Sequence, residues 1–241
     1  MASPVAKQAA YQVQKSPEGA SSTERIELAA LSLYNEQQME AFVMVRHYMA
    51  ALSAAEETRL RRRIRNYLRF RKAVRTFQEE HLADLCQQKC FVSHTSACCG
   101  REGIITFFAD VVLNVLVSTE KEIDALLAAL QSDRGGPNCV YLTSAGCLWR
   151  LKPVICEMFL CEEARRHLAQ GNGELARWWA RLKRQEKYYT WPTRPVLFDM
   201  LESLFIEAGY ESPLMYFHQS PGLLRLKSRR SSKAAKQSAV R

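Results

Sequence analysis

The chain has 241 residues, of which 47% are hydrophobic and 24% are charged, and its formal net charge is +9. This apolar content is enough for a sizeable core and excludes a wholly disordered chain, while 10 glycines and 8 prolines are too few for a fold dominated by strands and turns. The longest apolar run, residues 104–117, is shorter than the roughly 20 residues that a helix needs to span a bilayer. Because the N-terminus also lacks the apolar core of a signal peptide, we expect a cytoplasmic protein without a membrane span.

Two long helices are predicted after an N-terminal segment, residues 1–20, whose small, polar and aperiodic sequence is expected to be disordered. Serine and glutamate pairs with the spacing of a capping box predict where both helices begin. These pairs are Ser21 with Glu24 and Ser53 with Glu56. The helices are expected over about residues 21–51 and 53–85, and the short link between them predicts an antiparallel helical hairpin at residues 21–85.

The rest of the chain also favours helices, arranged around an irregular segment, residues 86–161, that contains every cysteine. Helices are expected over residues 104–117, 119–131, 161–169, 174–188 and 195–208, and Thr119 with Glu122 forms the predicted capping box of the second of these. A short hairpin is expected within residues 142–149, because a Ser-Ala-Gly turn lies between two short apolar pairs. Residues 162–221 are expected to pack on the cysteine region, and residues 222–241 to form a disordered basic tail. The predicted fold class is therefore mainly α, a helical scaffold around a metal-organised irregular segment.

All eight cysteines lie within a stretch of 76 residues, in two sequence groups. The groups are Cys86, Cys90, Cys98 and Cys99, and then Cys139, Cys147, Cys156 and Cys161. In a cytosolic protein, clustered cysteines at ligand-like spacing favour a metal site over disulfides, although redox chemistry and unrelated thiols stay open. Eight thiolates can fill two zinc sites of four cysteines each, or can hold a [4Fe–4S] cluster with four thiols left over, and thiolates suit both kinds of centre. All eight are therefore predicted metal ligands, with zinc or iron as the cofactor.

Three polar residues near the cysteines are candidates for supporting the metal ligands. His94 lies between Cys90 and Cys98, where it is either part of the site or a solvated loop residue. Asp110 and Asn114 share one face of an apolar helix, and such groups often hold ligands in place by hydrogen bonds. The alternative is that both are simply hydrogen-bonded polar groups of the core.

Short sequences around the cysteines follow a characteristic order. They are Ile104-Ile105, Glu122-Ile123, Cys139-Val-Tyr-Leu, Gly146-Cys147-Leu-Trp, Lys152-Pro153 and Phe159-Leu-Cys161. Together with the eight cysteines, this order resembles the YkgJ-like cysteine-cluster family, whose members are described as zinc- or iron-chelating domains. The chain departs from the family pattern in the seven residues between Cys90 and Cys98 and in Lys152, where the family has arginine. The resemblance covers residues 86–161 and implies metal chelation; the related flagellin lysine N-methylases add the alternative of an enzyme.

Positive charge is concentrated in two places. The tail, residues 222–241, holds seven basic residues and no acid, and removing these seven charges from +9 leaves +2. The second predicted helix carries nine cations with no acid among them, most of them opposite its apolar stripe. These cations are Arg59, Arg61, Arg62, Arg63, Arg65, Arg69, Arg71, Lys72 and Arg75. Either place could bind nucleic acid or an acidic protein surface, or could simply be solvated. The predicted anion-binding residues are Arg61, Arg62, Arg65 and Arg69.

The sequence leaves three functions open. The first is a metal-binding protein in which thiolates organise the cysteine region against the helices. The second is a metal-dependent protein-modifying enzyme such as a lysine N-methylase, although the sequence has no Gly-rich phosphate loop, G-x-S-x-G or H-E-x-x-H motif and no catalytic residue is assigned. The third is a nucleic-acid- or ribosome-associated module, for which residues 178–191 add aromatic rings beside cations.

Overall fold

A computed structural model of the chain describes residues 22–88, 99–100, 105–132, 138–170, 173–191 and 196–217, and of residues 22–32 it describes the backbone alone. The mainly α fold class is confirmed, since this part of the chain forms nine helices and one hairpin of two short strands. The helices are α1 (Ser22–Ala51), α2 (Ala54–His81), α3 (Ala83–Cys86), α4 (Phe108–Val117), α5 (Glu120–Gln131), α6 (Val154–Met158), α7 (Glu162–Ala169), α8 (Glu174–Thr190) and α9 (Leu197–Glu207). The strands are β1 (Leu142–Thr143) and β2 (Gly146–Cys147). None of the helices in these ranges is long and apolar enough to cross a membrane.

Two of the predicted capping boxes fix the starts of α2 and α5. At α2, the Ser53 hydroxyl accepts the Glu56 backbone N–H at 3.4 Å, and the Glu56 carboxylate accepts the Ser53 N–H at 3.0 Å. Thr119 and Glu122 make the same reciprocal pair at α5, at 3.4 and 2.7 Å. Each pair satisfies two backbone donors that the first turn of a helix leaves without partners. The predicted cap at Ser21 lies outside the described residues.

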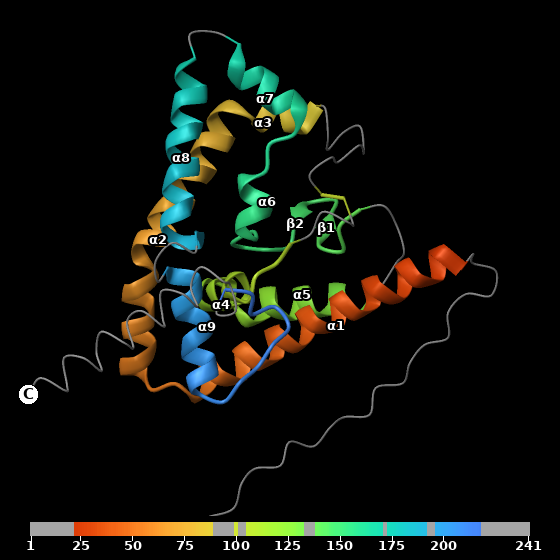
Figure 1. The fold of residues 1–241 in the computed structure, drawn as a ribbon, viewed down its shortest axis with the longest axis vertical. Helices are drawn as coiled ribbons and strands as arrows, with labels where there is room; N and C mark the ends of the chain where they lie inside the picture. The colour runs from red at the N-terminus through yellow and green to blue at the C-terminus, as the bar shows by residue number, and fades with distance from the viewer. Residues whose placement is uncertain are drawn as a thin grey trace, which may run out of the picture.

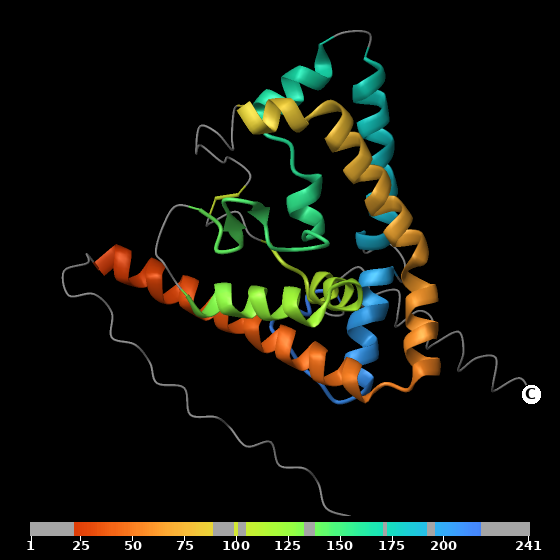
Figure 2. The same cartoon turned by 180° about the vertical axis from the view of Figure 1, so that it is seen from behind.

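The first two helices are consecutive, as predicted, but they do not form the expected antiparallel hairpin. Figures 1 and 2 show α1 and α2 diverging from their short link, with α1 against α4 and α5 and α2 against α8. The side chains explain the choice of partners. Phe42 of α1 packs against Trp149, with ring centroids 5.2 Å apart, whereas Tyr67 and Phe70 of α2 pack against Tyr189 of α8 at 5.1 and 5.4 Å. The two apolar stripes thus cover different surfaces and have no reason to face each other.

Helix α4 is the centre of the core, and every residue from Phe108 to Leu116 is buried. It begins four residues later than the predicted Ile104, and the reason lies outside its own sequence. Phe107 is extended, with φ −85° and ψ 152°, and the preceding Thr106 donates its backbone N–H to the Tyr34 hydroxyl of α1 at 2.9 Å. A tertiary contact therefore keeps these residues out of the helix.

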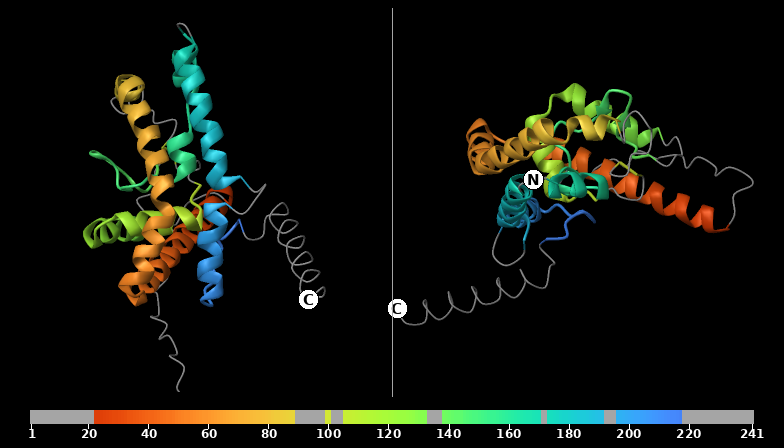
Figure 3. Two further views of the ribbon diagram at one scale, coloured as in Figure 1. Left: turned by 90° about the vertical axis from the view of Figure 1, so that its left-hand side faces the viewer. Right: turned by 90° about the horizontal axis from the view of Figure 1, so that it is seen from above.

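The remaining elements are arranged around α4. Helix α9 packs on it through Phe205, whose ring centroid is 4.9 Å from that of Phe108. Figure 1 shows α6 and the β1–β2 hairpin on the other side, between the two long arms formed by α1 and by α2 with α8. Seen from the side in Figure 3, α2 and α8 lie next to each other over much of their length. This arrangement gives the molecule an inner region that contains cysteines and an outer surface made by α2 and α8.

Candidate metal centre

The two sequence groups of cysteines meet at the backbone. The Cys139 N–H donates to the Cys99 carbonyl at 2.7 Å, and the neighbouring residues Gly100 and Asn138 form an isolated antiparallel bridge. Helices α4 and α5 lie between these two points in the chain. The contact therefore brings together residues that are 40 positions apart and that belong to different sequence groups.

A turn and the hairpin place Cys147 near Cys139. The Leu142 N–H donates to the Cys139 carbonyl at 2.9 Å, and Leu142 then pairs with Cys147 across the strands. The predicted turn of this hairpin is confirmed, and Gly146 has a φ of +108° that other residues rarely adopt. Burial, with smaller contributions from the nearby thiols of Cys147 and Cys156, raises the pKa of the Cys139 thiol to about 12. Three thiols thus share one electrostatic neighbourhood.

Backbone N–H groups lie against the sulfur atoms of three cysteines. Those of Tyr141 and Leu142 lower the pKa of Cys139, although burial outweighs them. The Trp149 N–H acts in the same way on Cys147, whose pKa is raised overall, chiefly because the thiol is buried. At the start of α7, the Ala164 N–H donates to the Cys161 sulfur at 3.4 Å. Donors in this position favour the negatively charged form of a sulfur atom.

Asp110 and Asn114 fasten the segment that carries Cys156. The Asp110 carboxylate accepts the Val154 N–H at 3.0 Å, and the Asn114 side-chain oxygen accepts the Leu151 N–H at 2.9 Å. Both side chains are buried on the same face of α4, as their spacing predicts. They are hydrogen-bonded core groups and, through these bonds, they also fix the backbone that leads to Cys156.

Helix α2 holds the same segment from its other side, through a buried arginine. Arg71 donates hydrogen bonds to the Glu157 carboxylate and the Lys152 carbonyl, and to the Tyr67 hydroxyl at 2.6 Å. Gln78 adds a bond of 2.5 Å to the Glu157 carbonyl. The prediction that placed Arg71 with the surface cations is therefore wrong, because its side chain is only 1% exposed. Its position seven residues after the buried Ile64 and four after Tyr67 is the signal that could have revealed this.

Burial also changes the protonation of Asp110. It raises the pKa of this carboxyl to about 7, whereas the positive charge of Arg71 and the N–H groups of Val154 and Phe107 act in the opposite direction. The Phe107 N–H donates to the second carboxylate oxygen at 3.2 Å. The group that fastens the cysteine segment thus titrates near neutral pH.

A polar network from α1 reaches the same neighbourhood, and the sequence analysis did not find it. The side-chain oxygen of Gln38 accepts hydrogen bonds from the Thr106 hydroxyl at 3.1 Å and from the Tyr141 hydroxyl at 2.9 Å. The pKa of Tyr141 is raised well above its usual value by burial and next by the Cys139 thiol. The amide nitrogen of Gln38 and the indole nitrogen of Trp149 are buried without a hydrogen-bond partner in the described part of the chain. Two unused donors therefore lie close to the cysteines.

The other predicted site residues are not brought to this point. Cys86 is exposed at the end of α3, and Cys161 begins α7. Cys90, His94 and Cys98 lie outside the described residues. Among the residues that are described, no group of three or more His, Cys, Asp or Glu side chains is arranged so that it could hold a metal ion. The thiols of Cys139, Cys147 and Cys156 share a neighbourhood without forming a complete coordination sphere from described residues.

Comparisons of the chain with protein-family models, with curated proteins and with solved structures found no match. The resemblance to the YkgJ-like family therefore stays a prediction.

Proposed function

We propose that the chain binds a thiolate-preferring metal, zinc or an iron–sulfur cluster, through the cysteines of residues 86–161. The observation that carries the proposal is the set of backbone N–H groups against the sulfur atoms of Cys139, Cys147 and Cys161. The thiolate is the form of cysteine that ligates metal ions, and N–H groups directed at sulfur stabilise that form. Three cysteines on separate turns share this feature.

The electrostatics of the thiols add a second argument. Because burial raises the pKa of Cys139 to about 12, this thiol stays neutral at physiological pH unless a positive charge lies beside it. A bound metal cation supplies that charge and removes the proton.

The proposed role of the metal is to complete the fold of the cysteine region. Segment 150–157 is already fastened to α2 and α4 by Arg71, Asp110 and Asn114. The β1–β2 hairpin, by contrast, contains only two residues per strand, which is too little to be stable by itself. A metal held by cysteines from both sequence groups would join this hairpin to the helices. The proposed ligand set also includes Cys90 and Cys98.

Metal analysis with a visible absorption spectrum tests the proposal, on protein purified without oxygen. About one or two zinc atoms per chain and no colour would support zinc sites made of four cysteines, and about four iron atoms with a brown colour would support a [4Fe–4S] cluster. A protein without either metal, whose thiols are found paired as disulfides, would overturn the proposal.

Substitutions in the hairpin locate the site. We expect Cys139→Ser and Cys147→Ser each to lower the metal content per chain and the melting temperature. Thr143→Ser is the matched control in the same hairpin, because it keeps the hydroxyl that donates to the Gly146 carbonyl at 2.8 Å. Equal metal content in all three variants would show that these two cysteines are not ligands.

A further inference from the structure

Four cations form a stripe along the outer side of α2. They are Arg62, Arg65, Arg69 and Lys72. Their spacing of three, four and three residues places them within an arc of about 80° on the helix, over a length of about 15 Å. All four are exposed and lie opposite the buried Leu60, Ile64 and Tyr67. None of the four forms an ion pair with a described residue, and the sequence has no acid between positions 58 and 78.

Arg61, which was predicted to bind anions together with three of these residues, does not belong to the stripe. Its guanidinium donates to the Glu57 carboxylate and to the Leu116 carbonyl, both at 2.7 Å. These bonds direct it toward the body of the protein. Arg61 thus already has partners within the protein, whereas Arg62, Arg65 and Arg69 have no ion pair with a described residue. Anion binding by these four residues stays a prediction.

A second stripe runs along the outer side of α8. It consists of Arg177, Arg181, Arg184, Tyr188 and Trp191. The spacing of four, three, four and three residues keeps all five on one side, over about 21 Å. Both aromatic residues are well exposed, Tyr188 at 59% and Trp191 at 50%. Of the two acids in α8, Glu186 is buried on the opposite side and pairs with Lys183 at 3.1 Å, whereas Glu174 is exposed three residues before Arg177.

The two stripes belong to one surface, which we call the basic–aromatic face. Helices α2 and α8 are packed side by side, with the rings of Phe77 and Trp178 at 5.2 Å and those of Phe70 and Tyr189 at 5.4 Å (Figure 3). Each stripe lies opposite the buried residues of its own helix. Both therefore face outward from the same pair of helices.

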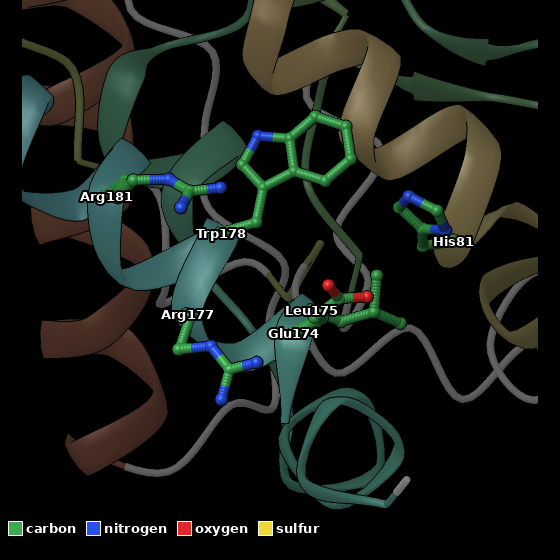
Figure 4. Close-up of a pocket in the computed structure, with 6 residues that line it drawn as sticks. All are labelled: His81, Glu174, Leu175, Arg177, Trp178 and Arg181. Atoms are coloured by element: carbon green, nitrogen blue, oxygen red, sulfur yellow. The ribbon is translucent and has the colours of Figure 1, made fainter. Parts of the chain in front are cut away.

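A cleft of about 390 Å³ lies where this face reaches the C-terminal end of α2. Arg177 and Arg181 of the α8 stripe line it, together with Trp178, His81, Leu175 and the acid Glu174. The rings of Trp178 and His81 pack against each other, with centroids 5.4 Å apart, and Figure 4 shows both arginines on the α8 side. The Nε2 atom of His81 is buried and lies 3.7 Å from the Glu80 carboxylate. The cleft thus adds an aromatic wall to the basic–aromatic face.

We propose that the basic–aromatic face binds single-stranded nucleic acid. Rows of exposed cations match a phosphate backbone, and the exposed aromatic rings at the end of the α8 stripe provide platforms on which unpaired bases stack. An acidic protein surface would need the cations but not the exposed Tyr188 and Trp191. Like charges at neighbouring positions of one helix repel each other, so a bound polyanion reduces the repulsion that destabilises this helix in the free protein. The face is independent of the cysteine region, and the inference stands apart from the proposed metal.

Binding is measured by fluorescence anisotropy on the full chain with its native metal content, using a labelled oligouridylate about 12 nucleotides long. Replacing Arg62, Arg65, Arg69 and Lys72 together by Gln should lower the affinity by about tenfold or more at moderate salt and make its salt dependence shallower. The matched control replaces four cations that already form exposed ion pairs, Arg46, Arg150, Arg165 and Arg166, by Gln. It removes the same charge and leaves the face and the basic tail intact, so we expect a change of less than about threefold.

The aromatic residues are tested by Tyr188→Ala with Trp191→Ala, which should lower affinity by about fivefold or more without changing the salt dependence. Metal content and melting temperature confirm that each variant is folded. The proposal is overturned if the wild-type chain does not bind the oligonucleotide, if the control loses as much affinity as the α2 variant, or if the aromatic variant binds like the wild type. It is also overturned if polyglutamate of equal charge competes as well as unlabelled oligonucleotide.

Discussion

The inner and outer sides of α2 use the same kind of residue for opposite purposes. Arg71, on the inner side, is buried and directs its donors to Glu157, Tyr67 and the Lys152 carbonyl. Arg69, two positions earlier, is exposed and has no ion pair with a described residue. The comparison teaches that the density of charge in a sequence does not identify a binding surface. The position of each cation relative to the apolar stripe decides whether it holds the fold together or faces solvent.

Arg71→Met is the change with the largest expected effect, because it leaves the buried Glu157 without its partner. We expect the free energy of unfolding to fall by about 3–5 kcal/mol, measured by urea denaturation. The double variant Arg71→Met with Glu157→Leu removes both charges and should recover a substantial part of this loss. A loss below about 1 kcal/mol in the single variant would mean that the inner contacts of α2 do not stabilise the fold.

Because of Asp110, the stability of the folded protein is predicted to depend on pH. Its pKa is raised from 3.8 to about 7, so the folded protein binds a proton that the unfolded chain has already released in this interval. The stabilising contribution is therefore complete below about pH 4 and is lost as the pH rises to about 7, with a limit of about 4 kcal/mol.

The measurement compares the wild type with Asp110→Asn across this pH interval, so that effects of pH on other groups, bound metal included, cancel in the difference. The stability of the wild type relative to the variant should decrease as the pH rises. A constant difference would show that Asp110 has the same pKa in the folded and unfolded chains.

Asn114→Ala should cost about 1–3 kcal/mol, because the buried Leu151 N–H loses its acceptor. If this bond also positions the cysteine segment, the alanine variant should release metal about tenfold more readily to a chelator. Equal release from the alanine variant and the wild type would limit the role of Asn114 to stability.

Arg69→Gln has the smallest expected effect and completes the comparison with Arg71. Its side chain is exposed and repels neighbouring cations, so the free energy of unfolding should change by less than about 0.5 kcal/mol and can rise slightly. Thermal melting at low and high salt measures this, and the difference from the wild type should shrink at high salt. A large loss of stability would show that the outer stripe also serves the fold.

The sequence predicts the elements of this fold where the signal is local. Ser53 with Glu56 and Thr119 with Glu122 cap the helices that their spacing predicts. The start of α4 was predicted too early because Thr106 is held by Tyr34, which lies 72 residues away. The helical hairpin was wrong for a similar reason, since partners of amphipathic helices are set by the whole core.

The candidate metal centre, too, could be predicted from the sequence only in part. The shared face of Asp110 and Asn114 follows from helical spacing, but their acceptor roles depend on backbone groups 44 and 37 residues away, respectively. The sequence did not indicate that Gln38 is a buried acceptor, because a single polar residue in a long helix is usually solvated. Its partners Thr106 and Tyr141 are also remote in sequence. The local sequence pattern also could not predict which cysteines lie close together, because the contact between Cys99 and Cys139 joins the two sequence groups.

That contact also makes a closed loop of the chain between residues 99 and 139, with α4 and α5 inside it. A metal bound by cysteines at both ends would act on the unfolded chain as a covalent cross-link does. By the chain-entropy relation, closing a loop of about 40 residues stabilises the folded state by about 4 kcal/mol. Helices α4 and α5, which themselves contain no cysteine, would share in that stability.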